Sequence, residues 1–408
     1  MRLSLKIVHI NAVTWGSTGR NAIEMCHYMN NIGHNCFLAY SDGVAPEGIV
    51  SYKIGSKIDH KLHALFSRIS GLQGYFSFIP TYRLLKWLKS LSPDIVHLHN
   101  LHANYINLGM LLKFLSKEKI ATVITLHDCW FFTGKCTHYI GMNCYKWQSQ
   151  CNNCPCLHMD NDSWFFDRTK KMFNDKRKLF NNLESLCVVG VSQWITNEAN
   201  KSILRNAKKL TTIYNWIDLD IFRPKIANSQ YLYDKYHISS GLFTVLFVSS
   251  IWKNDEKWND FLKISAALNK AFQVVCVGRL NNDLIIPECV IHIPFIEDIN
   301  ELALLYSHSD IYIHLSRHDT FGKVLAEALA CGTPIVAYSN TAINEIVPHD
   351  CGILVDTGDI NSIIKSVLRI KDQGKINYSA KCIQYASENF SLTRNIEMYL
   401  NEYIEILQ

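Results

Sequence analysis

The feature that most constrains this chain is a repeated alternation between short, continuous apolar runs and longer segments with helical periodicity. Apolar runs without polar alternation are typical of strands buried on both faces of a parallel sheet. Strand–helix alternation of this kind predicts doubly wound α/β domains. Strands are expected at residues 5–10, 36–40, 95–98, 122–125, 186–191 and 210–213, and again at 244–248, 272–277, 291–293, 311–314 and 334–337.

Two such series in 408 residues predict two domains. A polar turn near Asn215–Pro224 places the boundary, giving domains at 1–214 and 215–391 and a last helix, 392–408, that packs across it. Because open parallel sheets bind ligands at the carboxyl ends of their strands, we expect a cleft between the domains. Gly16–Gly19 is expected as a turn, and helices are expected at 21–32, 107–117, 260–268, 299–308, 323–330, 360–371 and 393–407.

Charge is divided unevenly along the chain. Residues 1–215 hold 25 basic and 13 acidic side chains, whereas residues 216–408 hold 16 and 23. The basic half suits a phosphate-bearing acceptor or an anionic membrane surface, although it could also be an ordinary solvated face. No nucleic-acid-binding motif is present, so nucleic acid is not expected as a partner. Lys6 and His9 interrupt the apolar start, which argues against a signal peptide, and a cytoplasmic location is expected.

The segment that carries the chemistry runs from residue 311 to residue 336. It reads as a strand, a loop, a helix, a Gly-Thr-Pro turn and a second strand. Asp319 lies in the loop, Gly322 stands where the helix begins, and Glu327 follows about one turn later. Backbone N–H groups and the helix dipole at that end favour a diphosphate. The two carboxylates could accept hydrogen bonds from two hydroxyl-bearing parts of one ligand, whereas an acidic pair without this context would be read as surface.

This segment resembles the E-x7-E signature of retaining glycosyltransferases of family four, in the pattern Asp-Thr-Phe-Gly-x4-Glu-Ala-Leu-Ala-Cys-Gly-Thr-Pro. The resemblance covers nearly the whole chain and implies the GT-B fold, in which two Rossmann-like domains face each other across a cleft. It implies that Glu327 binds the donor ribose and that Asp319, a catalytic residue, contacts the donor sugar. Phe321 and Gly322 would line the donor site. Asp319 replaces the usual Glu, which shortens its reach by one methylene.

Other positions of the second half agree with the resemblance. Lys257 matches the basic residue that holds the donor diphosphate, and its ammonium would neutralise phosphate charge as the nucleotide departs. Trp258 replaces the glycine that usually follows it. Asn215–Asp218 resembles the linker between the domains, so its acidic residues are not expected to bind a metal. No cofactor is expected for catalysis.

The first half contributes glycines and histidines at the ends of expected strands. The resemblance implies that Gly19 lies near the donor phosphates and that Arg20 faces the acceptor. His127 would lie beside the acceptor and the transferred sugar and counts as a catalytic candidate, with His99 second on the acceptor side. Neither is expected to act as a general base, because the donor phosphate of retaining members receives the acceptor proton.

The run Leu126–Gly134 with its following cysteines resembles a bacterial subgroup that builds colanic acid, capsule and O-antigen polysaccharides. That resemblance implies a nucleotide-sugar donor, a lipid-linked glycan acceptor and a peripheral position on the inner membrane. The basic and apolar segments 82–89 and 170–178 could be interfacial helices, or ordinary helices packed on a sheet.

Six of the fourteen cysteines fall in the loop 129–156. Cys136, Cys144, Cys151 and Cys154 could bind a structural zinc ion, and free thiols or a redox-sensitive bridge remain as alternatives. Two other functions also remain open: a UDP-sugar epimerase of the same fold, and a non-catalytic protein that binds membranes or anions.

Overall fold

The computed structural model describes residues 4–159, 161–225, 229–239, 241–268 and 272–408. The chain forms two compact units that divide between Tyr214 and Asn215. Unit 1 consists of residues 1–214 together with 396–408, and unit 2 of residues 215–395. Each unit has its own sheet and its own covering helices.

Unit 1 contains a seven-stranded sheet in the order β3-β2-β1-β4-β5-β6-β7, and every pairing is parallel. The chain order reverses between β1 and β4, which defines the switch point where such sheets bind ligands. The strands are β1 (Lys6–Val13), β2 (Asn35–Asp42), β3 (Ser51–Lys53), β4 (Ile95–Leu98), β5 (Ala121–Leu126), β6 (Leu186–Gly190) and β7 (Lys209–Thr212).

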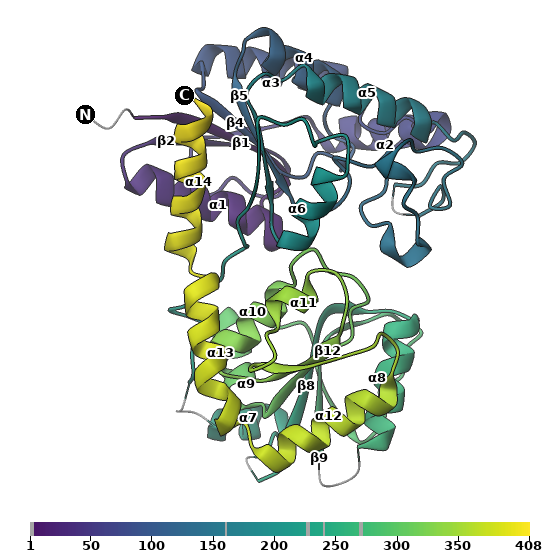
Figure 1. The fold of residues 1–408 in the computed structure, drawn as a ribbon, viewed down its shortest axis with the longest axis vertical. Coiled ribbons are helices and arrows are strands. Elements are labelled where there is room, and N and C mark those ends of the chain that lie inside the picture. Colours follow the sequence, from purple (N-terminus) through teal and green to yellow (C-terminus); the bar gives the residue numbers. More distant parts are fainter. Residues whose placement is uncertain (1–3, 160, 226–228, 240, 269–271) are drawn as a thin grey trace. The chain divides into compact units, whose positions relative to one another are not determined.

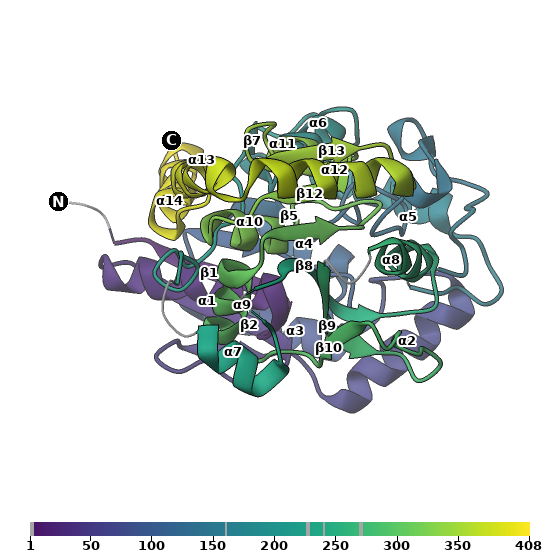
Figure 2. The same ribbon diagram turned by 90° about the horizontal axis from the view of Figure 1, so that it is seen from below.

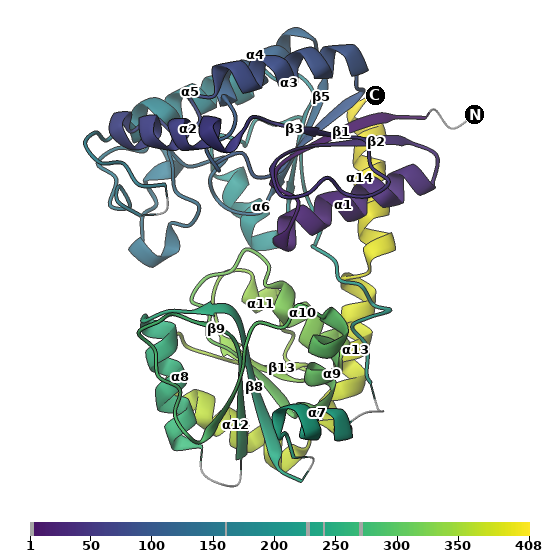
Figure 3. The same cartoon turned by 180° about the vertical axis from the view of Figure 1, so that it is seen from behind.

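Helices cover both faces of this sheet. Figures 1 and 3 show α3, α4 and α5 along one face and α1 with the last helix along the other. The C-terminal helix is tied to the sheet, because the hydroxyl of Tyr403 bonds His97 of β4 at 2.6 Å and that of Tyr399 bonds Thr125 of β5 at 3.0 Å. The helices are α1 (Gly16–Asn31), α2 (Lys57–Ser70), α3 (Phe78–Leu91), α4 (Leu108–Lys117), α5 (Thr169–Asn181), α6 (Gln193–Asn200) and α14 (Leu392–Ile406).

Unit 2 contains a six-stranded parallel sheet in the order β10-β9-β8-β11-β12-β13. This is the doubly wound order of a Rossmann-type domain, with its switch point between β8 and β11. The strands are β8 (Phe243–Trp252), β9 (Phe272–Leu280), β10 (Val290–Ile293), β11 (Ile311–His314), β12 (Ile335–Tyr338) and β13 (Gly352–Val355).

The core of unit 2 lies between this sheet and two helices, α8 and α12, whose buried faces include Phe261 and Val367. Figure 2 shows α9 and α10 on the other side of β8 and β9 from α8. The helices are α7 (Ser229–Tyr236), α8 (Glu256–Ala267), α9 (Ile299–His308), α10 (Lys323–Ala330), α11 (Ile343–Ile346), α12 (Ile360–Gln373) and α13 (Ile376–Asn389).

The predicted fold class, two parallel α/β domains, is confirmed, and the ranges expected for β4, β11, α9 and α10 match the observed ones. One expectation was wrong: Gly16–Gly19 is the first turn of α1 rather than a turn before it. The helix expected at 260–268 begins earlier, at Glu256, because the side chain of Asp255 accepts the N–H of Trp258 and caps it. Within the described residues, no helix is both long and apolar enough to cross a bilayer.

Candidate active site

The predicted donor residues of unit 2 gather around its switch point. Ser249 lies at the carboxyl end of β8, and Asp319 follows the adjacent strand, β11. The pairing of β8 with β9 is irregular between Val248 and Ile251, and this bulge reorients the strand at the site. The structure therefore brings together residues that lie far apart in the sequence.

Asp319 is fixed by several partners. Its carboxylate accepts a hydrogen bond from Nε2 of His314 at 2.6 Å, and its backbone N–H donates to the hydroxyl of Thr341 at 3.0 Å. The hydroxyl of Tyr312 bonds Nδ1 of His314 at 2.8 Å, which sets the orientation of that ring. Burial acts to raise the pKa of Asp319, but His314 and the charge of Lys257 outweigh it and lower that pKa below its usual value. Asp319 is therefore a carboxylate at neutral pH.

Lys257 lies on the first turn of α8 and reaches back to the bulge. Its ammonium donates to the hydroxyl of Ser249 at 3.0 Å and lies 4.6 Å from the ring centre of Trp252. Burial lowers the pKa of Lys257, while the nearby charges of Asp319 and Asp255 oppose that shift. A half-buried ammonium in this position is suited to neutralise an anionic group of a ligand.

Gly322 has to be glycine for the backbone to enter α10. Its φ of 83° lies in the left-handed region, and an added Cβ would lie 2.9 Å from Cδ1 of Leu325. No side chain caps this helix end, where the N–H of Leu325 donates to the carbonyl of Gly322 at 2.9 Å. The helix dipole favours an anion at this end. Phe321 is 2% exposed and packs edge-on against Phe390, with ring centres 5.4 Å apart. Its side chain is therefore part of the packing around the loop rather than an open donor contact.

Glu327 lies on α10, one turn after the helix begins, and is buried. Burial and the charge of Glu327 raise the pKa of Tyr306 well above its usual value, which places the carboxylate near that ring. Trp258, which stands where the family usually has glycine, is buried against Phe261 at 5.0 Å between ring centres. The tryptophan therefore belongs to the core of unit 2.

In unit 1, three histidines form a continuous chain of hydrogen bonds. Nδ1 of His9 lies 2.9 Å from Nε2 of His99, and Nδ1 of His99 lies 3.0 Å from Nε2 of His127. Because a neutral imidazole carries one proton, all bonds of the chain must point in the same direction. His99 is 1% exposed and its two ring nitrogens are engaged, so it positions His127 instead of offering a surface to an acceptor. His127 itself is half-buried at the end of β5.

A second polar cluster follows His127 directly. Nε2 of His102 donates to the carboxylate of Asp128 at 2.8 Å, and that carboxylate also accepts the N–H of Trp130 at 2.8 Å. Burial acts to raise the pKa of Asp128, but His102 outweighs it and the pKa is lowered. The buried Lys176 donates to the carbonyls of Trp130 and Thr133 and lies 3.6 Å from the centre of the Trp130 ring. These residues stabilise the loop that carries His127.

Sequence reasoning did not single out His9, His102, Asp128 or His314. For His314 the signal was available, because Tyr312 and His314 lie two positions apart and so share one face of β11. For His9 it was not, since its partner lies 90 positions away and a lone histidine in a buried strand has no readable spacing.

The glycine-rich segment of unit 1 has a packing role that its sequence did not show. A Cβ on Gly19 would lie 2.6 Å from the carbonyl carbon of Thr14, so glycine is needed for α1 to lie against the end of β1. Arg20 is exposed on the same helix. No side chain caps the start of α1 at Trp15.

Cys136, Cys144, Cys151 and Cys154 line one small cavity in unit 1 and are all half-buried free thiols. The N–H of Gly134 donates to the sulfur of Cys151 at 3.2 Å. Within the described part of the chain, no three of these four sulfurs lie within 4.8 Å of one another. Zinc binding here would require the loop to contract around the ion, and it stays a prediction.

A cavity of about 650 Å³ in unit 2 lies elsewhere, beside α12 and α13, and none of the predicted donor residues lines it. The donor residues at the switch point of the sheet are instead buried, as Glu327 is, or half-buried, as Lys257 and Asp319 are.

Two family models match the chain. Residues 18–221 match the Glycosyltransferase Family 4 domain, and residues 243–373 match Glycosyl transferases group 1. The chain is 26% identical over 312 residues to WcaC of Escherichia coli (strain K12), a protein assigned to colanic acid biosynthesis, covering 74% of this chain and 73% of WcaC. It is 23% identical over 367 residues to an uncharacterised protein of the cps region of Klebsiella pneumoniae, covering 83% and 86%.

Solved structures share the fold. A glycosyltransferase from Rickettsia africae superposes with a TM-score of 0.72 at 16% identity, covering 99% of both chains. The Anabaena protein HepE in complex with UDP superposes with a TM-score of 0.69 at 15% identity, covering 98% of this chain and 100% of HepE. These neighbours are GT-B glycosyltransferases, as predicted for the fold. Since the Glycosyltransferase Family 4 domain spans half of the sequence and a second glycosyltransferase domain covers residues 243–373, the chain belongs to glycosyltransferase family 4.

Proposed function

We propose that this protein transfers a sugar, with retention of configuration, from a nucleotide-sugar donor to a lipid-linked oligosaccharide in the synthesis of a surface polysaccharide. One observation carries the donor side of the proposal. At the switch point of unit 2, the carboxylate of Asp319, the ammonium of Lys257 and the uncapped start of α10 lie together. This set offers a cation and N–H groups to a diphosphate and a carboxylate to sugar hydroxyls.

Each residue then has a role. Lys257 and the N–H groups after Gly322 neutralise the diphosphate, and their attraction grows as charge develops on the departing nucleotide. Glu327 accepts hydrogen bonds from the ribose, and Asp319 holds a hydroxyl of the donor sugar. His127, positioned by His99, contacts the transferred sugar and the acceptor, and Gly19 and Arg20 contribute to the donor and acceptor sides. No resident cofactor or metal takes part in transfer.

The relatives support the substrate classes. HepE has been crystallised with UDP, with UDP and glucose, and with UDP-glucose. WcaC is assigned to colanic acid biosynthesis, and the structural neighbour WaaG is a glycosyltransferase of lipopolysaccharide biosynthesis. A nucleotide diphosphate sugar and a membrane-linked glycan are therefore the first substrates to test.

An exposed surface on unit 1 supports a position on the membrane. Helix α2 begins with a capping box of Ser56 and Asp59. It carries an exposed apolar stripe at helical spacing, and the N–H of Trp164 donates to the carbonyl of Arg68 at 2.8 Å, which places a second apolar group beside the stripe. The exposed apolar residues are Ile58, Leu62, Leu65, Phe66, Ile69, Trp164, Phe165 and Phe166, and the exposed basic residues are Lys57, Lys61, Arg68, Arg168 and Lys170.

Apolar side chains among basic ones suit the boundary of an anionic bilayer. For residues 82–89 and 170–178 the sequence left two alternatives, and packing is the one that fits the structure: α3 buries Leu84 and Leu88, and α5 buries Phe173 and Lys176. Sedimentation with phosphatidylglycerol vesicles, compared with phosphatidylcholine vesicles, tests the surface. Replacing Leu62 and Phe66 together by Glu should abolish binding, whereas the exposed Ile376→Glu in unit 2 should not change it.

The function itself is tested by transfer from UDP- and GDP-sugars to lipid-linked oligosaccharides from a polysaccharide-producing bacterium. Wild type should form a longer glycolipid, and Glu327→Ala should lose roughly 10²-fold in kcat/KM, about the effect of one lost charge-assisted donor contact. The exposed Glu388→Ala is the matched control and should remain active. Conversion of the nucleotide sugar to its epimer without transfer would identify an epimerase, and an unaffected Glu327→Ala would refute the donor assignment.

A further inference from the structure

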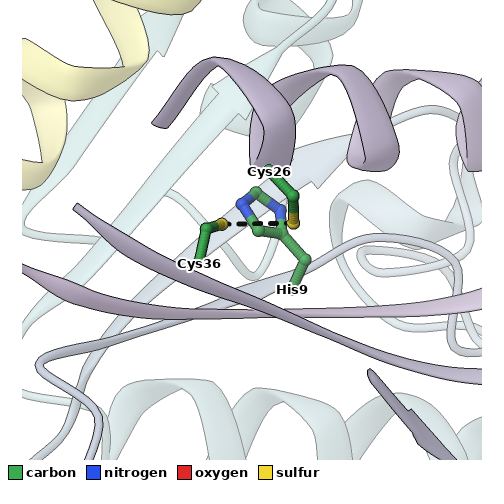
Figure 4. A group of neighbouring side chains, drawn as sticks. All are labelled: His9, Cys26 and Cys36. Carbon is green, nitrogen blue, oxygen red and sulfur yellow. Dashed lines mark hydrogen bonds between the residues drawn. The ribbon is translucent and has the colours of Figure 1, made fainter. Parts of the chain in front are cut away.

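Three side chains that take no part in the donor site converge in the interior of unit 1. His9 of β1, Cys26 of α1 and Cys36 of β2 are buried, and their ligand atoms all lie within 4.8 Å of one another. Figure 4 shows the imidazole beside the two thiols, whose sulfurs are 3.1 Å apart. They come from three elements that are consecutive in the chain and packed on one another.

One atom of this group has no hydrogen-bond partner: Nε2 of His9 is buried and unpaired in the structure. Its other ring nitrogen is held by His99 at 2.9 Å, which fixes the plane of the ring. Histidines that bind metals are commonly held in this way, with the second nitrogen hydrogen-bonded to a neighbour. The unpaired nitrogen is available as a ligand, and a ring nitrogen of His9 lies within 4.8 Å of both sulfurs.

A second group of possible metal ligands in the same region does not offer an available ring nitrogen on its other two histidines. His9, His97 and His99 also lie within 4.8 Å of one another. Both nitrogens of His97 are engaged, by Tyr403 at 2.6 Å and Thr125 at 2.7 Å, and both nitrogens of His99 are engaged by His9 and His127. The available lone pair is therefore that of His9, and the groups facing it are thiols.

We propose that His9, Cys26 and Cys36 form a buried site for one monovalent copper ion. Two thiols and an imidazole are soft ligands, which copper(I) and zinc both accept. Three donors in a dry interior favour copper(I), because it accepts three ligands, whereas structural zinc takes four. The ion displaces one thiol proton, which passes to solvent, so a Cu–S bond replaces an S–H bond and the site stays uncharged. Its oxidation state does not change.

The protonation states that burial gives to His9 and Cys36 agree with binding of copper(I). Burial lowers the pKa of His9 to about 3, so the imidazole is neutral throughout the physiological range. Burial and the neighbouring Cys26 raise the pKa of Cys36, so the sulfur of Cys36 is a thiol without an ion. Cys26 also faces the carbonyl of Phe37 at 3.7 Å, which can accept its remaining proton. To share a three-coordinate ion at metal–sulfur distances of about 2.3 Å, the sulfurs need to separate from 3.1 Å by roughly 0.9 Å.

The test uses the reduced full-length chain carrying Cys136→Ser and Cys154→Ser, so that the exposed loop does not compete. Copper(I) is supplied against a chromophoric copper(I) chelator. This chain should retain one more equivalent than its His9→Gln and Cys26→Ser derivatives, while the buried Cys187→Ser, outside the group, should retain it in full. Circular dichroism of each variant establishes that it is folded.

A second measurement uses only the chain with the intact site, so its result does not depend on whether the variants fold. X-ray absorption of the copper(I)-loaded chain should show a shell of two sulfurs and one nitrogen. Equal retention by all folded derivatives, or a shell of sulfur alone, would overturn the site. Retention of zinc in place of copper(I), with the same dependence on His9 and Cys26, would overturn the choice of ion. Recovery of a Cys26–Cys36 disulfide from the reduced, copper-treated protein would show that the pair is a redox couple instead.

Discussion

The carboxylate of Asp319 and the imidazole of His314 lie 2.6 Å apart, five positions from each other along the chain. This bond fixes the first acidic residue of the donor site, and it explains how a side chain shorter than the usual glutamate is held in place. It also makes the charge of Asp319 depend on a histidine that is not expected to touch substrate.

Replacing His314 by Gln should therefore alter the pH dependence of transfer. His314 lowers the pKa of Asp319, so its loss raises that pKa and moves the acid limb of the kcat/KM profile to higher pH. A hydrogen bond to a charged group contributes about 1.5–3 kcal/mol, so we expect a loss of roughly 10- to 10²-fold at neutral pH. The profile of Asp319→Asn serves as the reference, because that variant should have no such limb. An acid limb that does not move would contradict this coupling.

Lys257 should be important for the departure of the nucleotide. We expect Lys257→Met to lower kcat by roughly 10²-fold, as when a single charge-stabilising donor is removed from an active site. Lys257→Arg keeps the charge but cannot reproduce the 3.0 Å bond to Ser249 with the same geometry, so partial activity is expected. Steady-state kinetics with varied donor separates the two effects. Full activity of Lys257→Met would exclude the residue from the site.

Gly322→Ala should weaken donor binding without unfolding the chain. The backbone there has a φ of 83°, where an L-residue costs roughly 1–2 kcal/mol, and the loop is expected to shift to relieve it. A shift at the start of α10 moves the N–H groups, so UDP affinity measured by calorimetry should fall by about tenfold. Gly141→Ala, where nothing lies within 4 Å of the added carbon, is the comparison and should bind UDP as wild type does.

Because of Lys176, the free energy of unfolding of unit 1 should depend on pH in the alkaline range. Burial lowers the pKa of Lys176 from 10.5 to about 7 in the folded state. Between these values the unfolded chain binds the proton more strongly, so this group destabilises the folded state, and that penalty shrinks as pH rises from 7 towards 10.5. From pH 7 to 9 the gain should be roughly 2 kcal/mol.

Urea unfolding of wild type and Lys176→Met at both pH values measures this effect. Both proteins carry Cys151→Ser, because the charge of Lys176 acts on the pKa of that thiol and would not cancel in the comparison. Wild type should gain stability relative to Lys176→Met as pH rises, and a constant difference between them would contradict the assigned pKa.

Local patterns predicted most of the scaffold, because continuous apolar runs can only be buried strands in a chain of this kind. They predicted β4, β11, α9 and α10 with their observed ends. They missed α2, whose apolar residues are exposed, since periodicity shows that a stripe exists but not what covers it. They also placed Gly16–Gly19 outside α1, because glycine signals a turn unless tight packing, here against Thr14, demands it inside a helix.

The site was predicted in part, through residues close together in one motif. Asp319, Gly322 and Glu327 share a single loop and helix, so their neighbourhood could be read from the sequence. The chain from His9 to His127 could not, because it joins three strands through side chains that no local spacing connects. The burial of His99 could not be predicted either, because a polar residue is ordinarily expected at the surface.

Unit 1 is formed by two separate segments of the chain, because the last helix packs on it. Residues 396–408 complete it by bonding Tyr403 to His97 and by pairing Glu402 with Lys209 at 2.8 Å, whereas unit 2 is one uninterrupted run. On the ribosome the whole of unit 2 must be made before these contacts can form, a delay on the order of 10–40 s at ordinary rates of synthesis. During that interval the seven-stranded sheet lacks part of its cover. The unit that is synthesised first is therefore finished last, and a chain stopped after residue 395 would leave unit 1 incomplete, and unit 2 intact.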